Sequence, residues 1–205
     1  AYDIDKFMRT DMVVVNYDDK GTIDVSDSLQ IFVVEQILEA LDEDGQAMRM
    51  LRGSIGNYEG MEFFITDDNL LTDIASGDAL YVSFDRKGKI KYAERIFSLK
   101  QVLDAENSYE AAKKTLQTDR NSKTQLLTGW IDNIDLNAGD NENMLMLDGT
   151  TMLPIRLNGS SAKVIVYDAQ SKKTSVENIN AVEKGDLAII RLRYSTVKAI
   201  VVIKM

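Results

Sequence analysis

The chain has 205 residues, 44% hydrophobic and 28% charged, values typical of a soluble globular protein with one large or two small domains. Lys and Arg number 24 against 33 Asp and Glu, and this formal charge of -9 disfavours nucleic acids and anionic membrane surfaces as partners. Cysteine and histidine are absent, which excludes disulfides, thiol nucleophiles and Cys- or His-ligated metals, and removes the commonest general base.

A strand-turn-strand pattern occurs three times along the chain. Residues 11–23 align with residues 78–90, and residues 186–197 follow the same plan with a shortened turn. We therefore predict a mainly β protein of two tandem small SH3-like or OB-like β-barrels, with a short connecting helix and an N-terminal hairpin that resembles the end of a further module.

Residues 1–28 are predicted to form this N-terminal hairpin, either as a partial module or as strands exchanged between chains. Residues 1–10 lack a positively charged start followed by an apolar run, so no signal peptide is expected, and an exported form would be a mature fragment.

Residues 29–98 are predicted to form β-barrel module 1. Residues 29–40 are rich in β-branched side chains, and we favour a long strand over a helix because Asp42-Glu43-Asp44-Gly45 has the composition of a hairpin turn. Residues 46–55 and 61–66 follow as strands separated by a turn at residues 57–60, and residues 67–76 connect them to the repeated hairpin that Gly77-Asp78 begins.

Residues 99–123 are predicted to be a helical connector, with a helix at residues 108–117 that Ser108 caps. Residues 124–205 are predicted to form β-barrel module 2. Strands are expected near residues 144–147, 151–157 and 163–167, followed by a long loop at 168–184 and a final hairpin. The last strand, residues 197–204, is apolar enough to be buried on both faces or to pair with another molecule.

One turn of module 2 concentrates oxygen ligands of the kind that calcium prefers. The residues are Asp132, Asp135, Asn137, Asp140 and Glu142. Their spacing does not follow the EF-hand loop, because Gly139 stands where a ligand should be, and a solvated hairpin loop is the alternative interpretation. Calcium is the one cofactor that the sequence suggests.

Aromatic side chains could offer stacking surfaces for sugars or bases. The candidates are Tyr58, Phe63, Phe64, Tyr81 and Trp130. Because side chains alternate along a strand, about half of each strand's aromatics should be core instead. Trp130 follows Gly129 in an apolar strand and is expected in the core, whereas Tyr58 at a turn is the candidate for an exposed ligand contact.

Two acidic groups, residues 42–44 and Asp67-Asp68, could serve as a glycosidase pair, but turn chemistry explains acidic residues at such positions equally. Gly77-Asp78 and Gly185-Asp186 recur where the hairpin recurs, so we interpret them as shaping the start of a strand. No catalytic residue is predicted, and we expect the protein not to be an enzyme.

Residues 11–97 contain a series of short turn and strand motifs. These motifs lie at residues 33–45, 51–53, 60, 66–68, 77–78 and 85–90. This series resembles the β-barrel repeat modules of Gram-positive, clostridia-like cell-surface proteins, which often carry S-layer homology domains elsewhere. The resemblance implies an extracellular, cell-surface location and a structural or adhesive role, and it carries over no catalytic residue.

The sequence therefore favours a non-catalytic structural module of a surface layer, filament or appendage that self-associates through strand edges. Its expected partners are copies of itself or other cell-surface proteins. A module that binds cell-wall glycan or polysaccharide is the alternative, and a phage or injection-machine structural protein is a further one. Neither nucleic-acid binding nor membrane insertion is expected.

Overall fold

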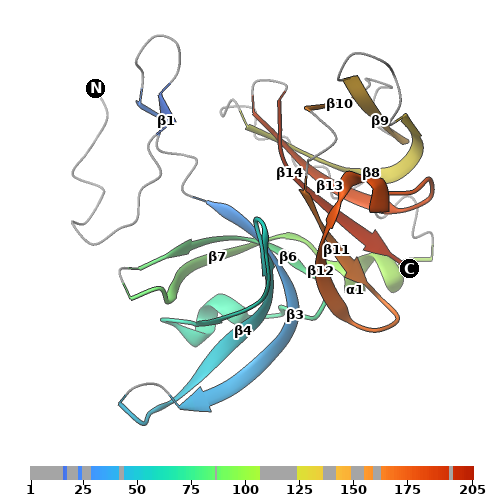
Figure 1. Cartoon of the computed structure of the whole chain (residues 1–205). Helices are drawn as coiled ribbons and strands as arrows, with labels where there is room; N and C mark the ends of the chain where they lie inside the picture. The colour runs from blue at the N-terminus through green and yellow to red at the C-terminus, as the bar shows by residue number, and fades with distance from the viewer. Residues whose placement is uncertain are drawn as a thin grey trace.

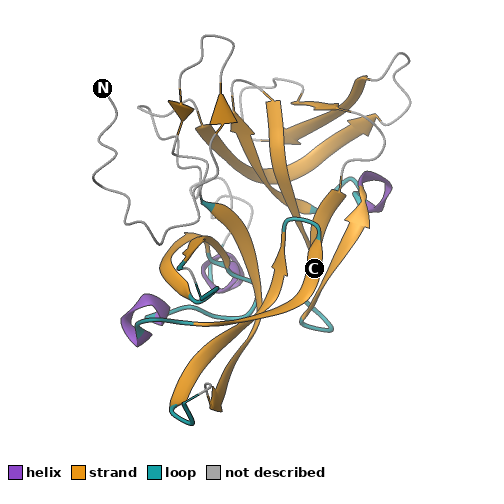
Figure 2. Ribbon diagram, turned by 60° about the vertical axis from the view of Figure 1, so that its left-hand side comes forward, coloured by secondary structure: helices purple, strands orange, loops and turns teal. Residues whose placement is uncertain are grey.

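The computed structural model describes residues 16–17, 23–24, 29–41, 44–85, 87–106, 124–135, 142–148, 155–158, 163–193 and 196–205. Strands make up most of the described chain and helices are confined to short segments (Figure 2), so the predicted mainly β class is confirmed. The short hairpin of β1 (Asn16–Tyr17) and β2 (Ile23–Asp24) pairs Tyr17 with Ile23, the same register that pairs Phe84 with Ile90 in the aligned hairpin.

The first unit, here called unit 1, is a five-stranded sheet in the order β5-β4-β3-β6-β7. Its strands are β3 (Gln30–Leu41), β4 (Ala47–Ile55), β5 (Tyr58–Phe64), β6 (Ala79–Phe84) and β7 (Ile90–Phe97), with the 3-10 helix η3 (Asp68–Leu71) between β5 and β6. A parallel bridge between Ile65 and Ile90 joins the end of β5 to β7 and brings the two sheet edges together. The preference for a strand over a helix at residues 29–40 is therefore confirmed.

The second unit, unit 2, repeats this plan inside a seven-stranded sheet. The order β10-β9-β8-β13-β14 matches β5-β4-β3-β6-β7, and β11 and β12 are added beside β14. The strands are β8 (Thr124–Asp135), β9 (Glu142–Asp148), β10 (Ile155–Asn158), β11 (Lys163–Asp168), β12 (Lys173–Asn178), β13 (Leu187–Arg193) and β14 (Thr196–Lys204), with the 3-10 helix η4 (Ile179–Ala181) before β13.

Three sequence predictions need correction or fall outside the described chain. The loop predicted at residues 168–184 is wrong, because it contains β12 and η4. The turn predicted at 57–60 lies earlier, at Gly56-Asn57, since Ile55 pairs with Tyr58. The helix predicted at 108–117 lies outside the described residues, but a short helix, α1 (Leu99–Leu103), follows unit 1 and has Ser98 as its N-cap.

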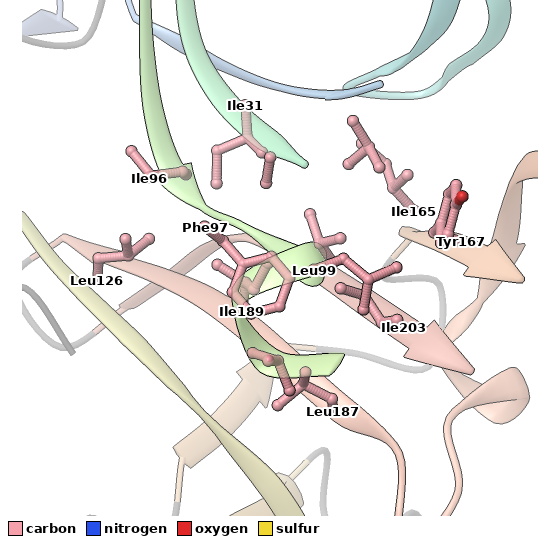
Figure 3. Packing of buried hydrophobic residues seen from close by; sticks show 14 residues of the cluster. Ile31, Ile96, Phe97, Leu99, Leu126, Ile165, Tyr167, Leu187, Ile189 and Ile203 are labelled. Carbon is pink, nitrogen blue, oxygen red and sulfur yellow. The ribbon is translucent and has the colours of Figure 1, made fainter. Parts of the chain in front are cut away.

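The two units share a hydrophobic core, which Figure 3 shows from close by. Unit 1 and α1 contribute Ile31, Val33, Ala79, Ile96, Phe97, Leu99 and Val102, and unit 2 contributes Leu126, Ile165, Tyr167, Leu187, Ile189, Val201 and Ile203. Neighbouring residues of the same strands point the other way, into a core of their own unit. This explains why the four consecutive residues from Ile31 to Val34 are all buried: β3 lies between two cores.

Polar contacts accompany the shared core. The Glu35 carboxylate accepts hydrogen bonds from the amide and the hydroxyl of Thr174 at 3.1 Å each, and the Glu59 carboxylate accepts from the amide of Val176 at 3.0 Å. Thr174 and Val176 belong to β12, the edge strand of unit 2, and both carboxylates come from unit 1. Unit 1 therefore covers this sheet edge, which would otherwise offer backbone donors to another chain.

Candidate functional site

A cavity of about 380 Å³ lies in unit 1. One side of it is formed beside the β3–β4 hairpin, which extends away from unit 2 in Figure 1. It is lined by Asp44, Glu62, Phe63, Phe64, Lys87, Gly88 and Lys89. These residues come from the loop between β3 and β4, from the end of β5 and from the turn between β6 and β7. We call it the hairpin cavity; its volume lies within the range typical of small-molecule sites.

The turn between β6 and β7 is held in shape by Asp85. Its Oδ1 accepts hydrogen bonds from the amides of Lys87 at 2.8 Å and Lys89 at 2.9 Å, and its own amide donates to the Lys89 carbonyl at 2.9 Å. Such side-chain bonds to the backbone two and four residues on are characteristic of aspartate in turns. The turn therefore presents both lysines to the cavity at fixed backbone positions.

Phe64 and Lys89 form the aromatic side of the hairpin cavity. The Lys89 Nζ atom lies 5.7 Å from the centroid of the Phe64 ring, within the range of a cation–π contact, and 3.5 Å from Sδ of Met48. Phe63 also lines the cavity, and its ring lies 6.0 Å from the ring of Phe32 and 4.7 Å from that of Phe84 at the core of unit 1. Phe63 and Phe64 are both half-buried, so each contributes part of its ring to the cavity wall.

The described lining of the hairpin cavity carries charges of both signs. It includes two carboxylates, Asp44 and Glu62, and two ammonium groups, Lys87 and Lys89. Glu62 also lies 3.6 Å from the guanidinium of Arg52. Carboxylates accept hydrogen bonds and ammonium groups donate them, so the cavity suits a neutral ligand with many hydroxyl groups next to an aromatic face.

The repeated Gly-Asp pair has the same set of backbone bonds in both units. In unit 1 the Val34 amide donates to the Asp78 carbonyl at 2.9 Å and the Gly77 amide donates to the Val34 carbonyl at 2.8 Å. In unit 2 Ile131, Asp186 and Gly185 take these places, at 2.8 Å for both bonds. The pair thus starts a strand and bonds it to the first strand of its unit, as the sequence predicts.

The aspartate side chains of these pairs are used within the fold. Asp78 is fully buried, and its carboxylate accepts from the amides of Ala75 at 3.0 Å and Leu99 at 3.2 Å, with Arg95 at 3.8 Å. Burial raises the pKa of Asp78 above its ordinary value, although the two amides and Arg95 act against it. Burial likewise raises the pKa of Asp186, whose carboxylate accepts from the amide of Glu183 at 2.9 Å.

Tyr58, the ligand contact predicted from the sequence, is the first residue of β5 and is 67% exposed. It follows the Gly56-Asn57 turn and is not among the residues that line the hairpin cavity. Its neighbour Glu59 points toward unit 2, so alternation along β5 directs Tyr58 to the other face of the strand. Trp130, expected in the core, is half-buried and packs against the shared core.

The predicted calcium ligands are only partly described. Asp132 and Asp135 are exposed on β8, and the Asp132 carboxylate lies 3.5 Å from Nζ of Lys184. Asn137 and Asp140 lie outside the described residues, as does the side chain of Glu142 at the start of β9. The described part of the chain contains no group of three His, Cys, Asp or Glu residues that could hold a metal ion, and the calcium site stays a prediction.

The sequence did not single out Glu62, Lys87 or Lys89 as site residues. The available signal was the turn at residues 85–88, which the repeat identified but which indicated a hairpin only. Asp67 of the second acidic pair caps η3 by accepting from the amide of Asn69 at 2.9 Å. Turn chemistry therefore accounts for Asp67, whereas Asp44 of the first group lines the hairpin cavity.

Comparison of the chain with family models, curated proteins and solved structures finds no match in any of the three. Among the described residues no helix has the length and apolar character needed to cross a membrane.

Proposed function

We propose that the protein is a non-catalytic module that binds a neutral oligosaccharide in the hairpin cavity, as part of an extracellular or cell-surface protein. The observation that carries the proposal is the position of this cavity. With β5 and β7 joined by the parallel Ile65–Ile90 bridge, the strands of unit 1 follow the order β3-β4-β5-β7-β6. This order supports the OB-like alternative of the two arrangements that the sequence suggests.

OB-type barrels bind oligonucleotides and oligosaccharides next to their second and third strands, between the loop after the first strand and the loop before the last. In unit 1 these loops are the β3–β4 and β6–β7 connections, and the third strand is β5. Asp44, Lys87 and Lys89 come from the two loops and Phe64 from β5. The cavity therefore lies where this arrangement of strands ordinarily meets a polymer.

The charge distribution favours a sugar over a nucleic acid. The formal charge of -9 repels a phosphate backbone, and the described lining of the cavity offers two carboxylates and two ammonium groups. A neutral oligosaccharide needs donors and acceptors in comparable number and an aromatic face, all of which are present. Cell-wall polysaccharide is the corresponding partner in the extracellular location that the resemblance implies.

Substitution of Phe64 tests this proposal. We expect Phe64→Ala to weaken the binding of neutral glucose or N-acetylglucosamine oligosaccharides by about tenfold, because one aromatic stacking contact is worth about 1.4 kcal/mol. Isothermal titration calorimetry with the full chain measures the affinity. Tyr92→Ala, which removes an exposed aromatic of β7 outside the cavity, is the matched control and should bind like the wild type. Binding that is lost in Tyr58→Ala but kept in Phe64→Ala would move the site to Tyr58, and no binding to any wall fraction would refute the proposal.

Self-association in a surface layer, filament or appendage is the second candidate. The shared core favours it, because two units that share buried side chains make a stiff building block. The C-terminal strand is not available for pairing between copies, since β14 lies between β13 and β11. Of the two edges of the seven-stranded sheet, β12 is covered by Glu35 and Glu59, whereas β10 pairs with β9 and lies close to β14. Pairing between copies would therefore use the part of β10 that β14 leaves accessible.

Electron microscopy and sedimentation at high protein concentration test this second candidate. Ordered assemblies that a proline in place of Arg156 on β10 prevents would support pairing through β10, because proline removes a backbone donor from the edge. A chain that stays monomeric at millimolar concentration would contradict it.

A further inference from the structure

A second cavity, of about 150 Å³, lies between the two units and is here called the inter-unit cavity. It is lined by Gln30, Ile31, Gly56, Asn57, Lys163, Ile165, Arg191, Lys198, Ala199 and Ile200. Three of these described lining residues are cationic and none is acidic, although acidic residues outnumber basic ones in the chain by 33 to 24. The cavity is therefore a local concentration of positive charge on an acidic protein.

The strand register brings the three cations together. Arg191 of β13 pairs with Ala199 of β14, and Ile165 of β11 pairs in parallel with Val201, which places Lys163 at the level of Ala199. Lys198 has no paired residue on β13, because Arg191 pairs with Ala199 and the next residue, Leu192, pairs with Val197. It is thus the extra residue of a β-bulge, a feature that redirects a side chain.

Arg191 is the fixed member of the three. The residue is only 8% exposed. Its Nη1 donates a hydrogen bond to the Leu29 carbonyl at 2.8 Å, and its guanidinium lies 5.7 Å from the centroid of the Tyr81 ring. Both of these contacts are to groups of unit 1. Lys163 and Lys198 are exposed at the mouth, and one N–H of Lys163 donates to Oδ1 of Asn178 at 2.8 Å, which leaves the ammonium with further donors.

The rest of the lining suits a sugar ring. Gln30 and Asn57 carry amides that both donate and accept hydrogen bonds, as hydroxyl groups require. Ile31, Ile165 and Ile200 supply an apolar surface. A volume of about 150 Å³ is below the range of drug-sized sites and admits one small group.

We propose that the inter-unit cavity binds a single acidic sugar residue, with its carboxylate or phosphate held by Lys163, Arg191 and Lys198. A dense polyanion is repelled by the net charge of the chain, so the ligand carries widely spaced charges, as an acidic glycan does. The proposal rests on the glycan-binding function and extends it to a second, charged subsite. The two cavities have no lining residue in common, so each can be substituted separately.

Calorimetric titration of the full chain with glucuronate, glucose 1-phosphate, glucose and inorganic phosphate tests the proposal. We expect the two acidic sugars to bind in a salt-sensitive manner and Lys163→Gln/Lys198→Gln to weaken them about tenfold. The matched control Lys100→Gln/Lys173→Gln removes two exposed lysines elsewhere and should leave the affinity unchanged. Gln30→Ala should weaken glucuronate but not inorganic phosphate.

Three results would overturn the proposal. The first is no binding of acidic sugars to the wild type, and the second is binding that Lys163→Gln/Lys198→Gln leaves unchanged. The third is formation of lysine-dependent dimers without sugar binding, which would assign the cavity to a carboxylate of a second copy. No binding of acidic sugars, together with neutral oligosaccharide binding that depends on Phe64, would refute the acidic subsite alone and leave the proposed function standing.

Discussion

At the scale of single residues, the two Gly-Asp pairs make the same backbone bonds but have different surroundings. Gly77 has φ +86° and Gly185 has φ +94°, a region that residues with a Cβ atom rarely adopt. A Cβ atom on Gly77 would lie 2.5 Å from Cδ2 of Leu99, whereas one on Gly185 would have nothing within 4 Å. Gly77 and Gly185 are therefore matched positions that share a backbone conformation and differ in how closely other atoms surround them.

We predict that Gly185→Ala lowers the free energy of unfolding by about 1–2 kcal/mol, the cost of a left-handed residue with a Cβ atom. Gly77→Ala carries this cost and also forces Leu99 in the shared core to move, so it should lose at least about 3 kcal/mol. Urea denaturation of the two variants measures both values. Equal losses of unfolding free energy in the two variants would contradict a packing constraint at Gly77.

The buried carboxyl of Asp78 predicts a dependence of stability on pH. Burial raises its pKa above the ordinary value of 3.8, so the folded protein binds the proton more tightly than the unfolded chain. The contribution of this group to stability is complete below pH 3.8 and is lost as the pH rises through the folded pKa. We predict that the wild type becomes less stable relative to Asp78→Asn as the pH rises from 3 to 7. Denaturation curves over this range measure the difference, and a change of opposite sign would refute the assignment.

At the scale of elements, sequence patterns predicted the strands that have a clear apolar run and missed those that do not. The run from Ile31 to Val34 identified β3, although its burial on both faces removes the alternation that a half-exposed strand would show. In β12 only Val176 is a large apolar residue, and the strand forms because β11 lies on one side and unit 1 on the other. Such tertiary support is not visible in a local pattern.

The β12 edge leads to a prediction about association. Glu35→Ala/Glu59→Ala removes the carboxylates that accept hydrogen bonds from the Thr174 and Val176 amides. These two backbone donors of β12 then have no hydrogen-bond acceptor in unit 1. We expect a loss of about 1–3 kcal/mol in the free energy of unfolding and a concentration-dependent increase in light scattering, because the open edge can pair with another chain. Glu39→Ala, which removes an exposed carboxylate further along β3, is the control. A double variant that stays monomeric with wild-type stability would show that the carboxylates do not protect the edge.

At the scale of the whole molecule, the repeat identified two similar units but could not show how they meet. Residues such as Val33 and Val201 are apolar, and the sequence does not say whether an apolar residue faces its own unit or the neighbour. In the structure the same strands supply both kinds of core, so that the units form one body and the inter-unit cavity exists only where they join. The hairpin cavity was equally hidden, because its residues come from three separate segments.

The most direct test of this arrangement uses Trp130, the single tryptophan, as a reporter in unit 2. Leu80→Ala removes a fully buried side chain from the core of unit 1, away from the shared core, and should lower the free energy of unfolding by about 2–4 kcal/mol. If the units form one body, the Trp130 fluorescence transition and the circular dichroism transition coincide in urea, and both shift to lower urea in the variant. A Trp130 midpoint that keeps its wild-type value while circular dichroism shows a separate, earlier transition would contradict a shared core.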